Sequence, residues 1–290
     1  FSKLLEWDTE CEMDKMIKKT AQDQRLPPNL PPQDFEQLPE KIGVYYFYNQ
    51  MKEVIYVGKA VNLKKRVASH FSGHNVNAQR QNFLKDIYGI SFEVCGTELM
   101  ALLLECDEIK RLWPIHNRAL KRFESKFGLY EYEARNGYKY LAIGKLTKFQ
   151  KCIQEFNSQY DGITVLQNLA RQFKIDHRFC QYGMSIVGEF FQKNDYINLP
   201  DADSHNRQIE NAIAFLLDNR PNFAIIDKGV SIDESSCIWV ENGHFYGMGY
   251  IPSDAGFNEP SEIKDCVTPY RSNQYMMHLI HAYAEKYPGK

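Results

Sequence analysis

The sequence predicts a mixed α/β (α+β) protein, in which a small antiparallel sheet flanked by helices is followed by a second α+β region. Two short runs rich in aromatic and β-branched residues, Gly43 to Tyr48 and Val54 to Val57, have the composition of strands. Thr97 is expected to cap a long amphipathic helix, which the apolar residues at helical spacing after it predict. Two Asn-Gly pairs, at 136–137 and 242–243, lie between strand-like runs and predict two further hairpins.

Local patterns define the elements of the first region. The polar segment Asn49 to Glu53 has the length of a hairpin connection, so the two runs beside it are expected to pair as antiparallel strands. Asn62 is a suitable N-cap for a helix that runs through Phe71. Ile90 to Cys95 is expected to add a third strand.

The distribution of proline indicates the domain organisation. Five of the twelve prolines lie between residues 27 and 39, which predicts an extended linker over 26–41. Residues 1–25 are expected to be the helical tail of a preceding domain. The linker then separates this tail from a first domain over 42–124 and a C-terminal α+β domain over 125–290.

Composition excludes a membrane protein and favours the cytoplasm. No run of about 18 apolar residues is present, as a membrane-spanning helix would need. The seven cysteines are an odd number, and no two of them form a Cys-x-x-Cys pair. This pattern is typical of reduced thiols and predicts a cytoplasmic protein.

The charge is unevenly distributed. The formal net charge is −2, yet residues 41–125 hold 13 Lys and Arg against 8 Asp and Glu. Two segments, 59–70 and 110–122, are basic and contain no acidic residue. Such runs are most often a solvated basic face, and they also suit a site that binds phosphate groups.

One carboxylate lies where packing does not favour it. The helix expected from Thr97 to Leu112 has Glu105 at the edge of its apolar stripe, whereas Asp107 and Glu108 point away from the centre of that stripe. A carboxylate at such an edge needs a partner. A salt bridge to a neighbouring Lys or Arg and a bound metal ion are the two alternatives.

Other polar groups are expected beside the same sheet. Arg66 and His70 are four residues apart on the first helix, and both border its apolar side. Tyr45 can share a sheet face with Tyr56. Each of these residues also has an ordinary structural explanation, because tyrosine pairs across strands usually serve packing and arginine stems often cover apolar surface.

The combination of motifs resembles a known family. GVY at 43–45, YVGKA at 56–60, NLKKR at 62–66, LLLECDEIKR at 102–111 and P-x-x-N at 114–117 follow one another in order. Together they resemble the GIY-YIG nuclease domain, most closely that of UvrC-type excision nucleases. The Pro-rich segment and the later runs PNFAIIDKG and WVENGHFYGMGYI also resemble bacterial proteins that fuse a DnaQ-like proofreading exonuclease to a GIY-YIG domain.

The resemblance implies a metal-dependent endonuclease that hydrolyses phosphodiester bonds in DNA and acts in DNA repair. Its implied partners are DNA and other DNA repair or replication proteins. The resemblance assigns catalytic roles to Tyr45, Tyr56, Arg66, Glu105 and Asn117. It assigns DNA or phosphate contacts to Lys59, Lys64, Lys65 and Arg118, and auxiliary roles to Gly58, for close approach, and His70. A catalytically inactive DNA-binding module is the alternative function.

The implied metal centre holds one Mg²⁺ or Mn²⁺ ion on Glu105, since Mg²⁺ is often held by a single carboxylate and several waters. Tyr56 is the implied general base, which requires nearby cations to lower its pKa, while Tyr45 is the alternative group for positioning the water. Where related fusion proteins have a cysteine-rich stretch, only Cys180 remains here. No iron–sulfur cluster or zinc site is therefore expected, because such sites usually have four ligands.

Overall fold

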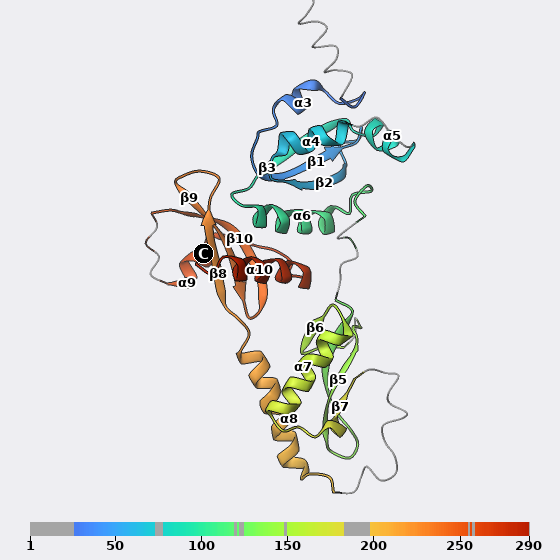
Figure 1. Cartoon of the computed structure of the whole chain (residues 1–290), viewed down its shortest axis with the longest axis vertical. Coiled ribbons are helices and arrows are strands. Elements are labelled where there is room, and N and C mark those ends of the chain that lie inside the picture. The colour runs from blue at the N-terminus through green and yellow to red at the C-terminus, as the bar shows by residue number, and fades with distance from the viewer. Residues whose placement is uncertain are drawn as a thin grey trace, which may run out of the picture.

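The computed structural model describes residues 26–72, 78–118, 121, 125–147, 150–182, 198–254, 256 and 259–289. These residues form three sheets, with strand orders β2-β1-β3, β6-β4-β5-β7 and β11-β10-β9-β8, surrounded by helices (Figure 1). The predicted mixed α+β class is confirmed. The tail predicted over residues 1–25 lies outside the described residues.

The first sheet is the predicted hairpin with one added strand. Its strands are β1 (Gly43–Tyr48), β2 (Val54–Ala60) and β3 (Gly89–Val94), and β1 pairs antiparallel with both neighbours. Both faces of β1 are buried, because alternate side chains enter two different cores. Val44 and Tyr46 pack with α6 (Glu98–Leu112), whereas Tyr45 and Phe47 pack with α4 (Leu63–Phe71).

Both predicted helix caps are confirmed. The side chain of Asn62 accepts a hydrogen bond from the backbone N–H of Lys65 at the start of α4. Thr97 accepts one from Met100 at the start of α6. Each cap satisfies a backbone donor that the first turn of a helix leaves without a partner. A further helix, α5 (Ala78–Lys85), lies between α4 and β3.

The orientation predicted for Glu108 is wrong. Glu108 is buried, with 8% of its surface exposed, and it forms an ion pair of 2.7 Å with Arg111. The cause is tertiary, because the C-terminal part of the chain covers this side of α6. The helical period alone places Glu108 away from the sheet. It does not show that the C-terminal part of the chain packs against that side of α6.

The prediction of an extended linker over residues 26–41 is wrong. This segment contains a short helix, α3 (Pro32–Glu36), and its Leu30 and Leu38 are buried in the same core as Tyr45. The carboxylate of Asp34 accepts a hydrogen bond of 3.0 Å from the backbone N–H of Ile90 in β3. Leucines interspersed among the prolines therefore give the segment apolar contacts that keep it on the first sheet.

The rest of the chain contains both predicted hairpins together with further helices and strands. The middle elements are β4 (Phe127–Glu133), β5 (Lys139–Lys145), β6 (Gln154–Phe156), α7 (Gln159–Gln172), a 3₁₀ turn (His177–Phe179), β7 (Cys180–Gln181) and α8 (Ala202–Asp218). The final elements are β8 (Phe223–Lys228), β9 (Glu234–Glu241), β10 (His244–Pro252), α9 (Pro260–Asp265), β11 (Val267–Pro269) and α10 (Gln274–Lys286). Gly137 and Gly243 have φ angles of 80° and 71°, the left-handed conformation that these hairpin turns require.

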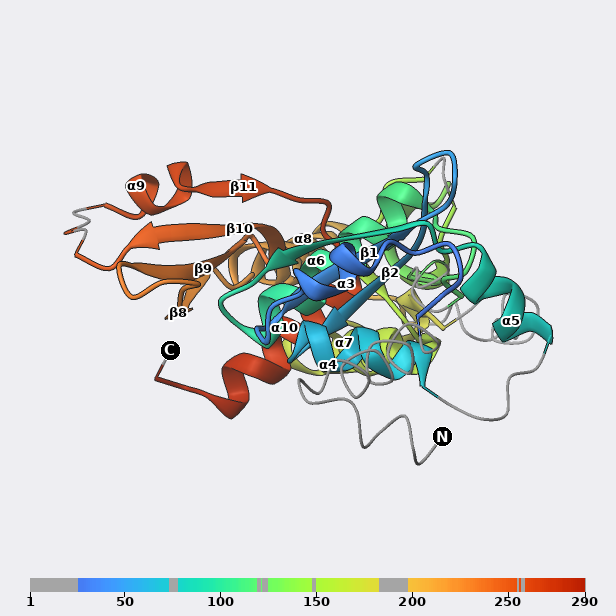
Figure 2. The ribbon, with the colours of Figure 1, turned by 90° about the horizontal axis from the view of Figure 1, so that it is seen from above.

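Residues 125–290 contain two separately packed units. The middle unit has its own core, formed by β4 to β7, α7 and α8. The final unit, β8 to β11 with α10, instead shares a core with α6 of the first region. In Figure 1, α6 lies between the first sheet and α10, and Figure 2 shows the final sheet extending to one side of the first region. The single C-terminal domain predicted over 125–290 is therefore two units, and each of them packs in a different core.

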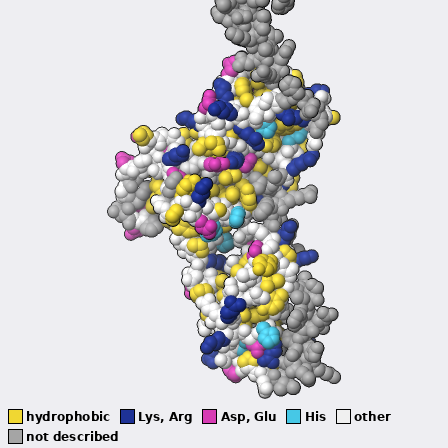
Figure 3. Space-filling model, in the orientation of Figure 1, with side chains coloured by type: hydrophobic (Ala, Val, Ile, Leu, Met, Phe, Trp, Pro, Cys, Tyr) yellow, Lys and Arg dark blue, Asp and Glu magenta, His cyan; other side chains and the backbone are white. Residues whose placement is uncertain are grey.

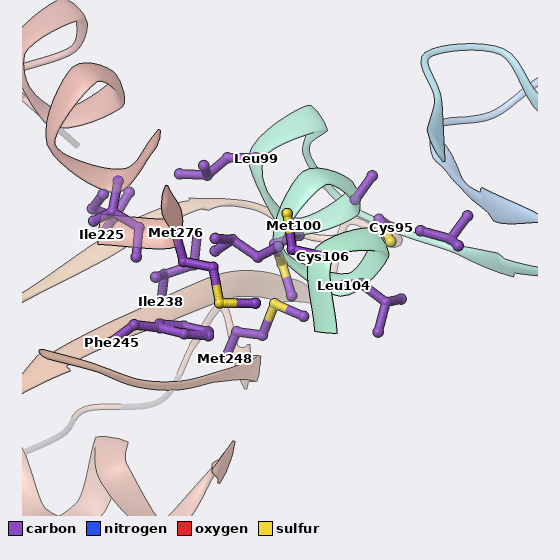
Figure 4. Packing of buried hydrophobic residues seen from close by; sticks show 14 of the residues in the cluster. Cys95, Leu99, Met100, Leu104, Cys106, Ile225, Ile238, Phe245, Met248 and Met276 are labelled. Carbon is purple, nitrogen blue, oxygen red and sulfur yellow. The ribbon is translucent and has the colours of Figure 1, made fainter. Parts of the chain in front are cut away.

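The shared core is built from apolar side chains of α6 and the final unit. Leu99, Met100, Leu104 and Cys106 of α6 meet Ile225, Ile238, Phe245, Met248 and Met276 (Figure 4). Each buried apolar side chain contributes about 1.5–3 kcal/mol relative to an exposed one. The final unit therefore stabilises the helix that carries Glu105.

Substitution of Met276 tests this shared core. Met276 is fully buried, so Met276→Ala is expected to lower the free energy of unfolding by about 2–5 kcal/mol. Met51→Ala is the matched control because Met51 is 74% exposed, and it should change this free energy by less than about 0.5 kcal/mol. Chemical denaturation measures both variants. Equal stability of Met276→Ala and the parent would contradict the shared core.

Candidate active site

Two tyrosines and a glycine form the centre of the site. Tyr45 is fully buried in β1, and Gly58 of β2 is its partner in the strand register. A Cβ atom at Gly58 would lie 2.5 Å from the Tyr45 hydroxyl oxygen and 2.9 Å from Cε1 of Tyr56. The ring centroids of the two tyrosines are 6.0 Å apart. The close approach predicted at Gly58 is present, because any side chain there would displace a tyrosine ring.

His70 completes this aromatic cluster from the last turn of α4. Its Nε2 atom lies 2.6 Å from the Tyr45 hydroxyl, within hydrogen-bond distance. Burial, together with the charges of the neighbouring cations Arg66 and Arg80, lowers the pKa of His70 to about 4. His70 is therefore neutral at pH 7, and its Nε2 atom shares a hydrogen bond with the Tyr45 hydroxyl.

Glu105 faces a cavity of about 610 Å³ beside this cluster. Its Oε1 atom accepts a hydrogen bond of 3.0 Å from the backbone N–H of Lys59, which fixes the carboxylate against β2. Burial raises the pKa of Glu105, while Lys59 and Arg66 partly oppose this rise. Within the described part of the chain, Glu105 forms no ion pair, so the salt-bridge explanation of this residue is not met.

The donor set at Glu105 fits a hard divalent cation with a largely water shell. Oxygen is the ligand type that Mg²⁺ prefers, and one or two carboxylates are usual. Among the described residues, no group of three or more His, Cys, Asp and Glu side chains is arranged to hold a metal ion. A zinc site of the usual four ligands therefore does not fit here, whereas a single carboxylate facing an open cavity does.

The predicted cations divide into two groups. Arg66 and Lys65 line the cavity with Glu105, and Arg66 is exposed. Lys59 also lines it, although its ammonium group forms an ion pair with Glu98. Lys64 and Arg118 are outside the lining of this cavity. In Figure 3, basic and histidine side chains lie together over the part of the surface where Figure 1 shows α4 and α5.

Asn117 holds β2 rather than facing the cavity. Its Oδ1 atom accepts a hydrogen bond of 2.9 Å from the backbone N–H of Val57, and its Nδ2 atom donates one of 2.8 Å to the backbone carbonyl of Val57. Asn117 is buried, and it does not line the cavity beside Glu105. These contacts anchor the strand between Tyr56 and Gly58, which makes Asn117 a positioning residue.

Nearby cations are predicted to lower the pKa of Tyr56. This prediction is wrong for the cations that the chain itself supplies. Burial raises the pKa of Tyr56, and Glu105 adds to the rise. A hydrogen bond from Tyr45 and the charge of Arg66 oppose it without reversing it. Tyr56 lines the cavity, whereas Tyr45 is fully buried and does not. Tyr56 is thus the tyrosine that can contact a water molecule in the cavity.

Sequence patterns missed several residues of the site. Ser69 lines the cavity with Glu105, and Arg80, Phe83 and His116 line a second cavity that adjoins it. The second cavity combines α5 with the loop after α6, two segments about 30 residues apart in the sequence. Helix α5 has no buried residue in its polar sequence, so its periodicity gives no signal for Phe83. The sequence gives one indication of this second cavity, which is that His116 lies next to Asn117 of the P-x-x-N motif.

The family comparison matches the region that contains this geometry. Residues 41–118 match the model of the UvrC-like GIY-YIG domain. These residues form a UvrC-like GIY-YIG domain. The resemblance predicted from the motifs is therefore confirmed for this part of the chain.

Relatives and solved structures extend the comparison. A UvrABC system protein C of Methanococcus maripaludis is 37% identical over 139 residues, which are 48% of this chain and 26% of that protein. The one of Dictyoglomus thermophilum is 46% identical over 90 residues, 31% of this chain and 14% of that protein. The N-terminal GIY-YIG endonuclease domain of Thermotoga maritima UvrC, solved with magnesium, is 28% identical; the match covers 30% of this chain and 94% of that one, with a TM-score of 0.27. This chain thus spans about a quarter or less of the two curated relatives.

The titration of His70 predicts how stability depends on pH. The folded-state pKa of about 4 is below the ordinary value of 6.5, so the unfolded chain binds the proton more readily. The stabilisation is complete above pH 6.5 and is lost as the pH falls toward 4. Between pH 7 and pH 5, the parent should lose on the order of 2 kcal/mol more unfolding free energy than His70→Gln. Urea denaturation at both pH values measures this, and identical losses in the two proteins would contradict the buried, neutral His70.

Proposed function

We propose that this chain is a metal-dependent endonuclease that hydrolyses phosphodiester bonds in DNA. The observation that carries the proposal is one cavity lined by a carboxylate, Glu105, an arginine, Arg66, and a tyrosine, Tyr56. This combination supplies a ligand for a divalent cation, a group that binds phosphate oxygens and a hydroxyl that contacts water. The UvrC-like GIY-YIG domain over residues 41–118 supports the same activity.

Glu105 is the residue that would hold the metal ion, for which Mg²⁺ and Mn²⁺ are the candidates. When bound, such an ion supplies electrostatic stabilisation for the phosphate and the leaving oxygen. The hydrogen bond from the backbone N–H of Lys59 keeps the Glu105 carboxylate in place before any ion binds. This fixed position reduces the conformational cost of forming the site.

Arg66 and the lysines bind the substrate. The planar guanidinium of Arg66 donates two parallel hydrogen bonds to phosphate oxygens, a geometry that a lysine lacks. Lys59 and Lys65 line the same cavity and attract the DNA backbone electrostatically. We place Lys64 and Arg118 on more distant parts of the backbone path, since neither lines the cavity.

Tyr56 is the group that accepts a proton from the attacking water or orients that water. Burial raises the pKa of Tyr56, whereas the hydrogen bond from Tyr45 and the charge of Arg66 oppose this rise and favour the phenolate, the form that accepts a proton. Tyr45 is held in turn by His70. The three aromatic side chains thus act in series, with Tyr56 at the cavity and with Tyr45 and His70 positioning it.

The biological setting follows from the relatives. The curated relatives are UvrABC system proteins C, and on this basis we place the activity in DNA excision repair, with other repair proteins as partners. The link to a DnaQ-like exonuclease rests on the resemblance in the Pro-rich and C-terminal motifs and stays a prediction. No helix among the described residues is long and apolar enough to cross a membrane.

Plasmid nicking tests the proposal. The parent is expected to convert supercoiled plasmid to nicked circles with Mg²⁺ or Mn²⁺. Glu105→Ala should reduce the rate by about 1000-fold, the equivalent of several kcal/mol of transition-state stabilisation. Glu133→Ala, an exposed glutamate in β4, is the control and should cleave like the parent.

Two results would contradict the proposal. Equal cleavage by Glu105→Ala and the parent would show that Glu105 is not the metal ligand. Salt-dependent binding of DNA without cleavage under either ion would instead support a catalytically inactive DNA-binding module.

A further inference from the structure

A second cavity of about 440 Å³ adjoins the one that contains Glu105. The two cavities share Tyr56, Arg66 and Ser69 in their lining. The remaining residues that line the second cavity are His70, Gln79, Arg80, Phe83 and His116. The proposed hydrolysis gives no role to the last four of these, although they lie directly beside the group that binds the phosphate.

Half of the residues that line the second cavity have aromatic rings: Tyr56, His70, Phe83 and His116. Phe83 is half-buried, and its ring centroid lies 4.9 Å from that of His116 and 5.6 Å from that of Tyr56. Aromatic side chains beside a backbone-binding site form platforms on which nucleobases stack, each stacked base contributing about 1–3 kcal/mol. A phosphate group alone would gain nothing from these rings.

The walls of this cavity are held in place by hydrogen bonds. The backbone N–H of His116 donates to the carbonyl of Ile55 at 3.0 Å, and the ring Nε2 of His116 lies 3.3 Å from Asp86. Arg80 donates to the carbonyl oxygens of His70 and Ser72 at 3.1 and 2.8 Å. The cavity is thus formed before a ligand enters, which lowers the entropy cost of binding.

The polar groups at this cavity also suit a base. Gln79 is exposed, and its side-chain amide can both donate and accept hydrogen bonds at a base edge. Arg66 and Arg80 add positive charge, which suits the phosphates on either side of that base. Asp86 does not line this cavity, and it lies 3.3 Å from Nε2 of His116.

We infer that the second cavity binds a nucleobase, namely the unpaired base of the nucleotide next to the phosphate that is cut. This inference rests on the proposed function, because it takes the cavity with Glu105 as the site of cleavage. The faces of a base inside a duplex are covered by the neighbouring bases, so such a base is not free to stack on the rings of Phe83 and His116. The enzyme therefore favours DNA in which that nucleotide is mismatched or single-stranded, since such a base costs least to unstack.

Oligonucleotide duplexes with a mapped cleavage site test the inference. One set carries a single mismatch immediately beside that site, a second carries the same mismatch several base pairs away, and a third is fully paired. The parent should cleave the first set about tenfold faster than the other two. In Phe83→Leu and His116→Ala this ratio should fall to near one, while Asn82→Ala, an exposed residue on the same helix, should keep it.

A binding measurement separates this inference from the proposed function. The base beside the site is replaced by 2-aminopurine, whose fluorescence is quenched by stacking on an aromatic ring. The duplex is then titrated with Glu105→Gln, and with Glu105→Gln combined with His116→Ala. Quenching with the first protein and not with the second is the expected result, whether or not the parent cleaves.

The outcomes of these two experiments distinguish a failure of the base site from a failure of the proposed endonuclease activity. Cleavage with no preference for the adjacent mismatch and no quenching would overturn the base site and leave the endonuclease intact. Quenching that depends on His116, without cleavage by the parent, would support the base site and contradict the proposed function. Loss of fold in Phe83→Leu, seen by circular dichroism, would leave His116→Ala as the deciding variant.

Discussion

The candidate site depends on the contact between the Tyr45 ring and the backbone of Gly58. This contact buries Tyr45 in β1, sets its hydroxyl 2.6 Å from His70 and leaves Tyr56 as the tyrosine that lines the cavity. The same strand, β2, donates its Lys59 N–H to Glu105 and is anchored by Asn117 at Val57. A shift of β2 by a fraction of an ångström would move all of these groups together.

Helix α6 connects this site to the rest of the chain. One side of α6 presents Glu105 to β2, and another side packs with β8 to β10 and α10. The position of the carboxylate therefore depends on the final unit, although none of the described residues of that unit lines the cavity. The middle unit has its own core, and its role is not defined by these contacts.

Much of the GIY-YIG domain was predictable because its signals are local. The hairpin, the caps at Asn62 and Thr97 and the edge position of Glu105 follow from spacing within a few residues. The burial of Glu108, the packing of the Pro-rich segment and the cavity between Phe83 and His116 were not predictable. Each depends on contacts between segments distant in the sequence, which neither periodicity nor composition records. The raised pKa of Tyr56 was missed for a similar reason, since burial outweighs the cations that the sequence shows nearby.

An NMR titration of the His70 ring in Gly58→Ala is the most direct test of the contact between Tyr45 and Gly58. The added methyl group displaces Tyr45, so the His70 pKa should rise from about 4 toward its ordinary value of 6.5 as the cluster opens. Gly144→Ala is the control, because a Cβ there has only ordinary contacts with Tyr130, at 3.5 Å, and the His70 pKa should stay low. An unchanged His70 pKa in a folded Gly58→Ala protein would contradict the central role of the Tyr45–Gly58 contact.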